Sequence, residues 1–216
     1  MTSPKKPYDD TVTQGGTASM WVFKTLVMIK NRHLSVAIGI LSLMTSFVYA
    51  GEDSPGSNPF MSVHEMRMGV LAHDVDDLWS GKQKEEGVDI NGEAILNIFN
   101  HQTLNGTIRP NLGMTINTSG DTSKIYTGMV WERPLPYKLS IHLGIGLAVH
   151  DGELDTNDPD KKSLGSHVLF HIPIEVGYKL GPRYRVYLYF DHMSNAYLAS
   201  PNEGMDTLGI RVGYRF

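Results

Sequence analysis

The feature that most constrains the fold is an alternation of apolar with polar or small residues, which recurs along the chain from residue 62 onward. A side-chain period of two is the period of a β-strand. The clearest copies have apolar residues at every second position: Leu139, Ile141, Leu143, Ile145, Leu147 and Val149; Val168, Phe170, Ile172, Ile174, Val176, Tyr178 and Leu180; Tyr184, Val186, Leu188 and Phe190; and Leu208, Ile210, Val212, Tyr214 and Phe216. The pattern predicts an all-β domain.

Weaker copies of the alternation at 66–72, 88–98, 108–116 and 125–131 bring the predicted strands to eight. Their length is roughly the 9–11 residues that a tilted strand needs to cross a bilayer. Charged residues occupy several of the opposite faces, as at Glu175 and Lys179 or Arg211 and Arg215. A soluble sandwich turns such a face to water, whereas a membrane barrel turns it to the lumen and its apolar face to lipid. Alternation alone leaves both folds open.

The N-terminal region favours export. A basic run at 30–33 precedes an apolar stretch at 34–48, which ends in Val48-Tyr49-Ala50 before Gly51. This order is typical of a cleaved signal peptide, and the stretch is short for a membrane-spanning anchor. We expect residues 1–50 to comprise an N-terminal extension and the signal peptide, with translation starting at Met28. Residues 51–61 are then a flexible lead-in, and residues 62–216 form the β-domain.

Two further features favour a barrel in the membrane. Glycines recur on the polar faces, which suits the crowded interior of a small barrel. Short connections at 133–136 and 181–183 alternate with longer polar ones at 75–87, 150–166 and 194–205, as in outer-membrane proteins. The end of the chain, Tyr214 and Phe216, resembles the C-terminal signature of those proteins. We predict an eight-stranded antiparallel transmembrane β-barrel in the bacterial outer membrane.

The composition of the chain excludes several classes of function. The net charge of −4, from 19 basic and 23 acidic residues, gives no basic surface for a nucleic acid. The absence of cysteine excludes thiolate metal sites and disulfides. Neither a cofactor nor a bound metal is expected. We expect the remaining histidines to be mainly hydrogen-bond partners in the lumen, namely His64, His73, His142, His150, His167 and His171.

The alternation also orients a group of reactive residues. Continued past Phe190 and back from Leu208, it turns His192, Ser194 and Asp206 outward, toward lipid. An even number of strands places both termini in the periplasm, so these residues lie near the outer leaflet. A serine needs an adjacent base, and a carboxylate can orient that base. We therefore expect a Ser-His-Asp triad acting on a lipid ester.

An oxyanion in such a site needs hydrogen-bond donors. Candidates are Asn195, Asn202 or a backbone N–H of the loop that joins the last two predicted strands.

The stretch Asp191-His192-Met193-Ser194-Asn195-Ala196, followed by Pro201-Asn202-Glu203-Gly204-Met205-Asp206, resembles the PagL-type lipid A 3-O-deacylases. The resemblance implies an outer-membrane serine esterase, a carboxylic ester hydrolase, that removes the 3-O-linked acyl chain of lipid A in lipopolysaccharide. It implies that Ser194 is the nucleophile, His192 the base, Asp206 the orienting acid and Asn202 an oxyanion donor.

Two positions depart from the family pattern. Asp206 stands where the best-known members have glutamate, and Tyr197 stands where a small residue is common. Glu203 is a rival for the acid, although it matches the loop acid of the pattern better. A non-catalytic adhesion or resistance barrel and a phospholipase or acyltransferase barrel remain alternatives, and a homodimer is also open.

Overall fold

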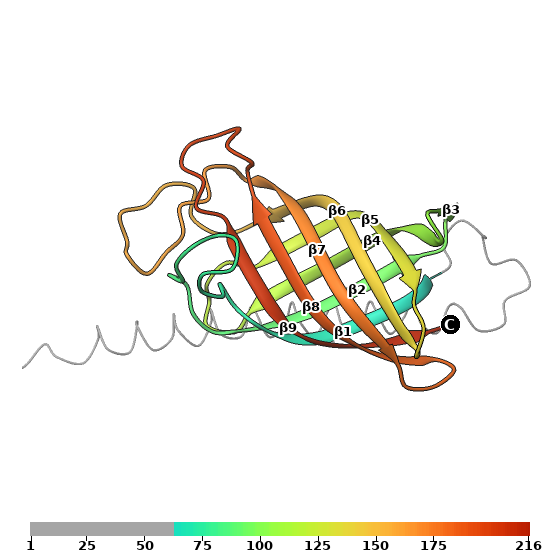
Figure 1. Ribbon diagram of the computed structural model, residues 1–216. Coiled ribbons are helices and arrows are strands. Elements are labelled where there is room, and N and C mark those ends of the chain that lie inside the picture. The colour runs from blue at the N-terminus through green and yellow to red at the C-terminus, as the bar shows by residue number, and fades with distance from the viewer. Residues whose placement is uncertain (1–62) are drawn as a thin grey trace, which may run out of the picture. The chain divides into compact units, whose positions relative to one another are not determined.

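The computed structural model describes residues 63–216, and the signal-peptide, extension and lead-in predictions lie outside these residues. The described residues form a closed antiparallel β-barrel (Figure 1). No helix among them is long and apolar enough to cross a membrane.

Eight strands form the wall, as the alternation predicted. They are β1 (Val63–Ala72), β2 (Val88–Leu96), β4 (Gly106–Asn117), β5 (Lys124–Pro134), β6 (Leu139–His150), β7 (Val168–Lys179), β8 (Tyr184–Ser194) and β9 (Met205–Arg215). A short strand, β3 (His101–Thr103), pairs with the start of β4 inside the connection from β2. Pairing of β1 with β9, and of β2 with β4, closes the ring.

The two faces of the wall decide between a soluble and a membrane fold. Large apolar side chains such as Ile145, Leu188 and Ile210 point outward and are more than half exposed, at 63%, 53% and 52%. Charged side chains such as Arg67 and Arg211 point inward and are 1% exposed. This is the arrangement of an outer-membrane barrel, and it confirms the membrane alternative over the sandwich.

The lumen is filled by a network of ion pairs. Arg67 contacts Glu175 through Nη1 at 2.5 Å and Glu65 through Nε at 3.1 Å. Arg211 contacts Glu93 through Nη2 at 2.8 Å and also pairs with Glu175. Buried charges are tolerated only when they are paired and hydrogen-bonded, and each member of this network has such a partner.

Glycine allows the strands to approach closely. A Cβ on Gly146 would lie 2.2 Å from the Thr127 carbonyl oxygen, and one on Gly209 would lie 2.2 Å from that of Val70. The predicted crowding at these glycines is therefore present, and it comes mainly from the backbone of the neighbouring strand.

The two ends of the barrel differ as predicted. The short connections 135–138 and 180–183 lie at the end that also holds the C-terminus (Figure 1). The longer loops 73–87, 151–167 and 195–204 gather at the other end, above the last residues of β8 and the first residues of β9 (Figure 1). These loops surround the candidate site.

Candidate active site

The β8–β9 hairpin brings the three predicted residues together. Its register makes His192 and Asp206 direct partners, and Ser194 lies two residues farther along the same face of β8. His192 Nδ1 is 2.7 Å from Asp206 Oδ1, and His192 Nε2 is 2.9 Å from Ser194 Oγ. The imidazole thus joins a carboxylate to a hydroxyl, which is the arrangement that activates a serine nucleophile.

The triad lies on the outward face, but a loop covers much of it. On β8, Tyr189, Asp191 and Met193 point inward and are fully buried, which leaves His192 and Ser194 on the outer side. His192 and Asp206 are nevertheless only 5% and 0% exposed. The prediction that all three side chains face lipid therefore needs one change, because the Asp206 carboxylate is covered by the protein.

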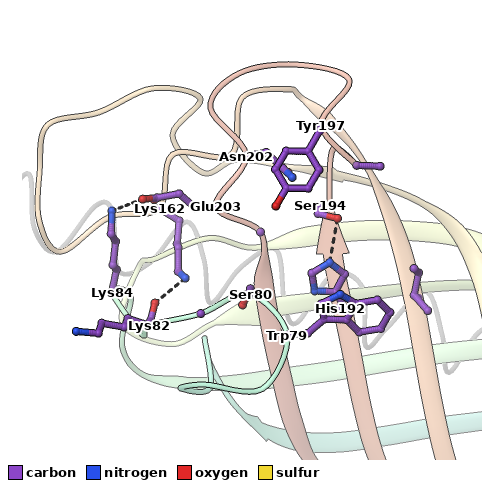
Figure 2. A pocket seen from close by; sticks show the side chains of 14 residues that line it. Trp79, Ser80, Lys82, Lys84, Lys162, His192, Ser194, Tyr197, Asn202 and Glu203 are labelled. Carbon is purple, nitrogen blue, oxygen red and sulfur yellow. Dashed lines mark hydrogen bonds and ion pairs between the residues drawn. The ribbon is translucent and has the colours of Figure 1, made fainter.

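The cover is Trp79, in loop 73–87. Its indole stacks on the His192 imidazole with ring centroids 4.3 Å apart and an interplanar angle of 11° (Figure 2). The backbone N–H groups of Trp79 and Ser80 donate to Asp206 Oδ2 at 2.5 and 2.7 Å. Both oxygens of the carboxylate are thereby held. Sequence reasoning missed these two residues, and the only signal was a tryptophan in a polar loop.

Loop 73–87 is itself anchored. Asp74 Oδ2 accepts hydrogen bonds from the backbone N–H groups of Lys84 and Glu85 at 2.7 and 3.1 Å. At the start of the loop, His73 lies between Asp89 Oδ2, 2.9 Å from Nδ1, and Glu85 Oε2, 3.1 Å from Nε2. Burial alone would lower the pKa of His73, but hydrogen bonds to Asp89 and Glu85 outweigh burial and raise the pKa to about 9. At neutral pH a charged His73 therefore ties the root of the loop to β2.

The two candidate asparagines have different positions. Asn202 lines the pocket, and its Oδ1 accepts a hydrogen bond from the Asn195 backbone N–H at 2.9 Å. Asn202 and Ser194 both line the pocket (Figure 2). The Asn195 side chain is 3% exposed and donates through Nδ2 to the carbonyls of Leu164 and Pro201 at 3.0 and 2.8 Å. Asn195 therefore holds the loop, and of the two asparagines it is Asn202 that lines the pocket.

The rival acid and the unusual tyrosine also lie near the pocket. Glu203 accepts a hydrogen bond from the Ser163 backbone N–H at 2.7 Å and pairs with Lys84 Nζ at 2.5 Å. Asp206, and not Glu203, is therefore the carboxylate that contacts His192. Tyr197 has a left-handed backbone, with φ of 62°, and is 87% exposed at the mouth of the pocket.

The pocket beside the triad has a volume of about 710 Å³, within the usual range for small-molecule sites. Ser194 and His192 line one part of it, and Lys82, Lys84 and Lys162 line another (Figure 2). Within residues 63–216, no group of three or more histidine and acidic side chains is placed to hold a metal ion.

The predicted role of the other histidines can be followed in the lumen. His142 contacts Ser140 and Arg67, and His171 contacts Tyr189 and Asp191. These histidines are hydrogen-bond partners, as expected.

Known proteins resemble this chain in part of its sequence and in its fold. The family model of lipid A 3-O-deacylase (PagL) matches residues 111–215, which include the triad. The fold is similar to that in the crystal structure of the outer-membrane enzyme PagL, with a TM-score of 0.51 and 20% sequence identity. The alignment covers 70% of this chain and 99% of the PagL chain. The N-terminal β-barrel domain of Pseudomonas aeruginosa OprF is 10% identical, covering 72% of this chain and 98% of its own, with a TM-score of 0.49.

No curated protein matches the chain. The homodimer stays a prediction. The matched segment and the closed barrel show that the chain is an outer-membrane β-barrel whose residues 111–215 match the lipid A 3-O-deacylase (PagL) family.

Proposed function

We propose that this protein is a serine esterase that hydrolyses the 3-O-linked acyl chain of lipid A. The observation that carries the proposal is the hydrogen-bonded chain from Asp206 through His192 to Ser194, which opens on a pocket at the outward rim of the barrel. A site on the outward face at the long-loop end suits a substrate that is itself part of the outer leaflet. The match of residues 111–215 to the family model of lipid A 3-O-deacylase supports the same reaction.

In the first half of the reaction, His192 Nε2 takes the proton of Ser194 as Oγ attacks the ester carbonyl carbon. Asp206 accepts the hydrogen bond of Nδ1–H and stabilises the imidazolium that forms. The tetrahedral intermediate collapses when its bond to the sugar oxygen breaks, and His192 returns the proton to that oxygen. The acyl chain is then esterified to Ser194.

In the second half, His192 removes a proton from water, which attacks the acyl carbon. The bond to Ser194 Oγ breaks, Oγ regains its proton from His192, and the free fatty acid leaves. The Asn202 amide or a backbone N–H of the 195–204 loop donates to the oxyanion in both halves.

Mass spectrometry of lipid A from cells that express the wild type or Ser194→Ala tests the proposal. We expect the wild type alone to remove the mass of one hydroxyacyl chain. Heat-modifiable migration on a gel checks that the variant is a folded barrel.

Identical spectra would overturn the proposal in favour of a non-catalytic barrel. A gain of acyl mass, or release of lysophospholipid, would instead indicate the acyltransferase or phospholipase alternative.

A further inference from the structure

The pocket that holds the triad has a second, cationic part. Lys82 and Lys84 come from loop 73–87, and Lys162 comes from loop 151–167 (Figure 2). The one acidic side chain among the described residues that line the pocket is Glu203. The lining therefore carries more positive than negative charge, on the side away from Ser194.

Lys162 is the fixed member of this group. It is 1% exposed, and its Nζ donates to the Lys82 carbonyl oxygen at 2.7 Å and pairs with Asp74 Oδ1 at 3.2 Å. These contacts hold the backbone of residue 82 in place at the pocket. Lys162 thus positions the cationic part.

Lys82 and Lys84 are the accessible members. Lys84 pairs with Glu203, but the two side chains remain 32% and 31% exposed, and a pair this exposed is easily exchanged for another partner. Lys82 is exposed, and no carboxylate in residues 63–216 lies within ion-pair distance of its ammonium group. Two ammonium groups can therefore turn toward an anion in the pocket.

We propose that Lys82 and Lys84 bind a phosphate group carried by the sugar of the substrate glycolipid. This inference rests on the proposed deacylase function. A phosphate accepts strong charge-assisted hydrogen bonds from lysine. The phosphate would then be held by the lysines while the ester lies at Ser194. The sugar that carries both groups is thereby fixed at two points. The lysines then select the ester that reaches Ser194.

Glu203 has a defined place in this scheme. In the free enzyme it is the internal counter-ion of Lys84, and an incoming phosphate must replace it. Glu203→Gln removes the competing charge, and the amide oxygen can still accept the Ser163 backbone hydrogen bond. The lysine and glutamate substitutions should therefore have opposite effects on phosphate recognition.

The test uses the purified full chain and two substrates with the same acyl chains, lipid A and enzymatically dephosphorylated lipid A. The readout is the ratio of kcat/KM for the first substrate to that for the second. We expect the wild type to prefer the phosphorylated lipid. Replacement of both Lys82 and Lys84 by glutamine should lower the ratio by about tenfold or more, mainly through KM, as loss of charge-assisted hydrogen bonds predicts. Glu203→Gln should raise the ratio.

The control is Lys179→Gln, at the opposite end of the barrel, which should leave the ratio unchanged. Inorganic phosphate should compete with the lipid in the wild type more strongly than in the double lysine variant. Competition without any preference between the two lipids would mean that the site takes free phosphate and would overturn the proposal. An unchanged ratio in folded lysine variants would also overturn it.

Failure of the deacylase function gives a different result. In that case the wild type hydrolyses neither substrate, or Ser194→Ala hydrolyses as well as the wild type. The lysine site can then still be judged by calorimetric titration of Ser194→Ala with the two lipids. Equal affinity for both lipids would overturn the lysine proposal.

Discussion

The barrel contains two serine–histidine pairs of nearly identical local geometry and different surroundings. On β8, Ser194 Oγ is 2.9 Å from His192 Nε2, and on β6, Ser140 Oγ is also 2.9 Å from His142 Nε2. In both pairs the residues are two apart on one face of a strand. The β8 pair faces outward beside the pocket, whereas the β6 pair faces the lumen, where its residues are buried.

The other ring nitrogen shows why the two pairs differ. His192 Nδ1 meets the Asp206 carboxylate at 2.7 Å, whereas His142 Nδ1 lies 3.2 Å from Arg67 Nη2. A carboxylate stabilises the imidazolium that a general base becomes, and a guanidinium does not. The space around His142 and Arg67 is also too small for a ligand. The serine–histidine contact therefore does not define the site by itself. The site also needs a carboxylate on the other ring nitrogen and a pocket that admits substrate.

The largest expected effect separates the two serines. Ser194→Ala should lower kcat/KM for acyl release by about 10⁴-fold or more, because the nucleophile is lost. Ser140→Ala should keep nearly full activity, since it removes one lumen hydrogen bond, worth about 1 kcal/mol of stability. Both are measured on purified, folded barrels. A folded Ser140→Ala barrel without activity would contradict the comparison.

The second effect concerns the partner of the imidazole. Asp206→Asn should reduce kcat by about 10³- to 10⁴-fold, because an amide at this position favours the wrong tautomer of His192. Asp206→Glu keeps the charge and should retain more activity than Asp206→Asn. Steady-state kinetics on lipid A measures both. Equal activity of the two variants would show that the charge at this position is not what matters.

A third, smaller effect tests the cover. Trp79→Ala should reduce kcat roughly three- to tenfold, the size expected for loss of an aromatic stack on the His192 ring. Trp79→Phe should restore most of the loss. Trp131→Phe, a change on β5 remote from the triad, is the matched control and should have no effect on kcat. If Trp79→Ala and the control were equally active, the stack would have no part in catalysis.

The smallest effect is a change in loop stability with pH. Because the folded pKa of His73 is raised to about 9, its stabilising contacts are fully present below its ordinary value of 6.5 and are lost as pH rises through about 9. Loop 73–87 should then become a few-fold more sensitive to trypsin at Lys82 and Lys84, with protease activity normalised at each pH. His73→Gln should be sensitive already at neutral pH, with a flatter pH dependence.

Cleavage at Lys138, in a turn at the other end of the barrel, provides the internal reference. The same pH dependence in the wild type and His73→Gln would exclude His73 as the anchor.

The triad and the wall could be predicted from the sequence for the same reason. A strand alternates strictly, so the exposed row from Tyr184 to Leu188 fixes the side of β8 on which His192 and Ser194 lie. The antiparallel hairpin then brings Asp206 opposite His192. These relations are local, and they depend only on the strand period and the pairing of neighbouring strands.

The rest depends on contacts between distant segments. Trp79 lies 127 residues before Asp206, and its hydrogen bond depends on the path of a loop that has no periodic pattern. The hydrogen bond from Asn195 Nδ2 to the Leu164 carbonyl likewise depends on where loop 151–167 lies. Loop conformations of this kind are set by the packing of the whole upper end, which a single sequence does not display.

The pairing of β1 with β9 has a consequence for maturation. Ser194, His192 and Asp206 all belong to one hairpin, which could exist before the ring is complete. Trp79 and Ser80 lie in the loop that follows β1, and they reach Asp206 because the first strand of the wall is paired with the last. Closure of the barrel between β1 and β9 is therefore also what brings these two residues to the proposed site. A barrel in which β1 has not yet paired with β9 would therefore hold Ser194, His192 and Asp206 without the two backbone donors to Asp206 Oδ2.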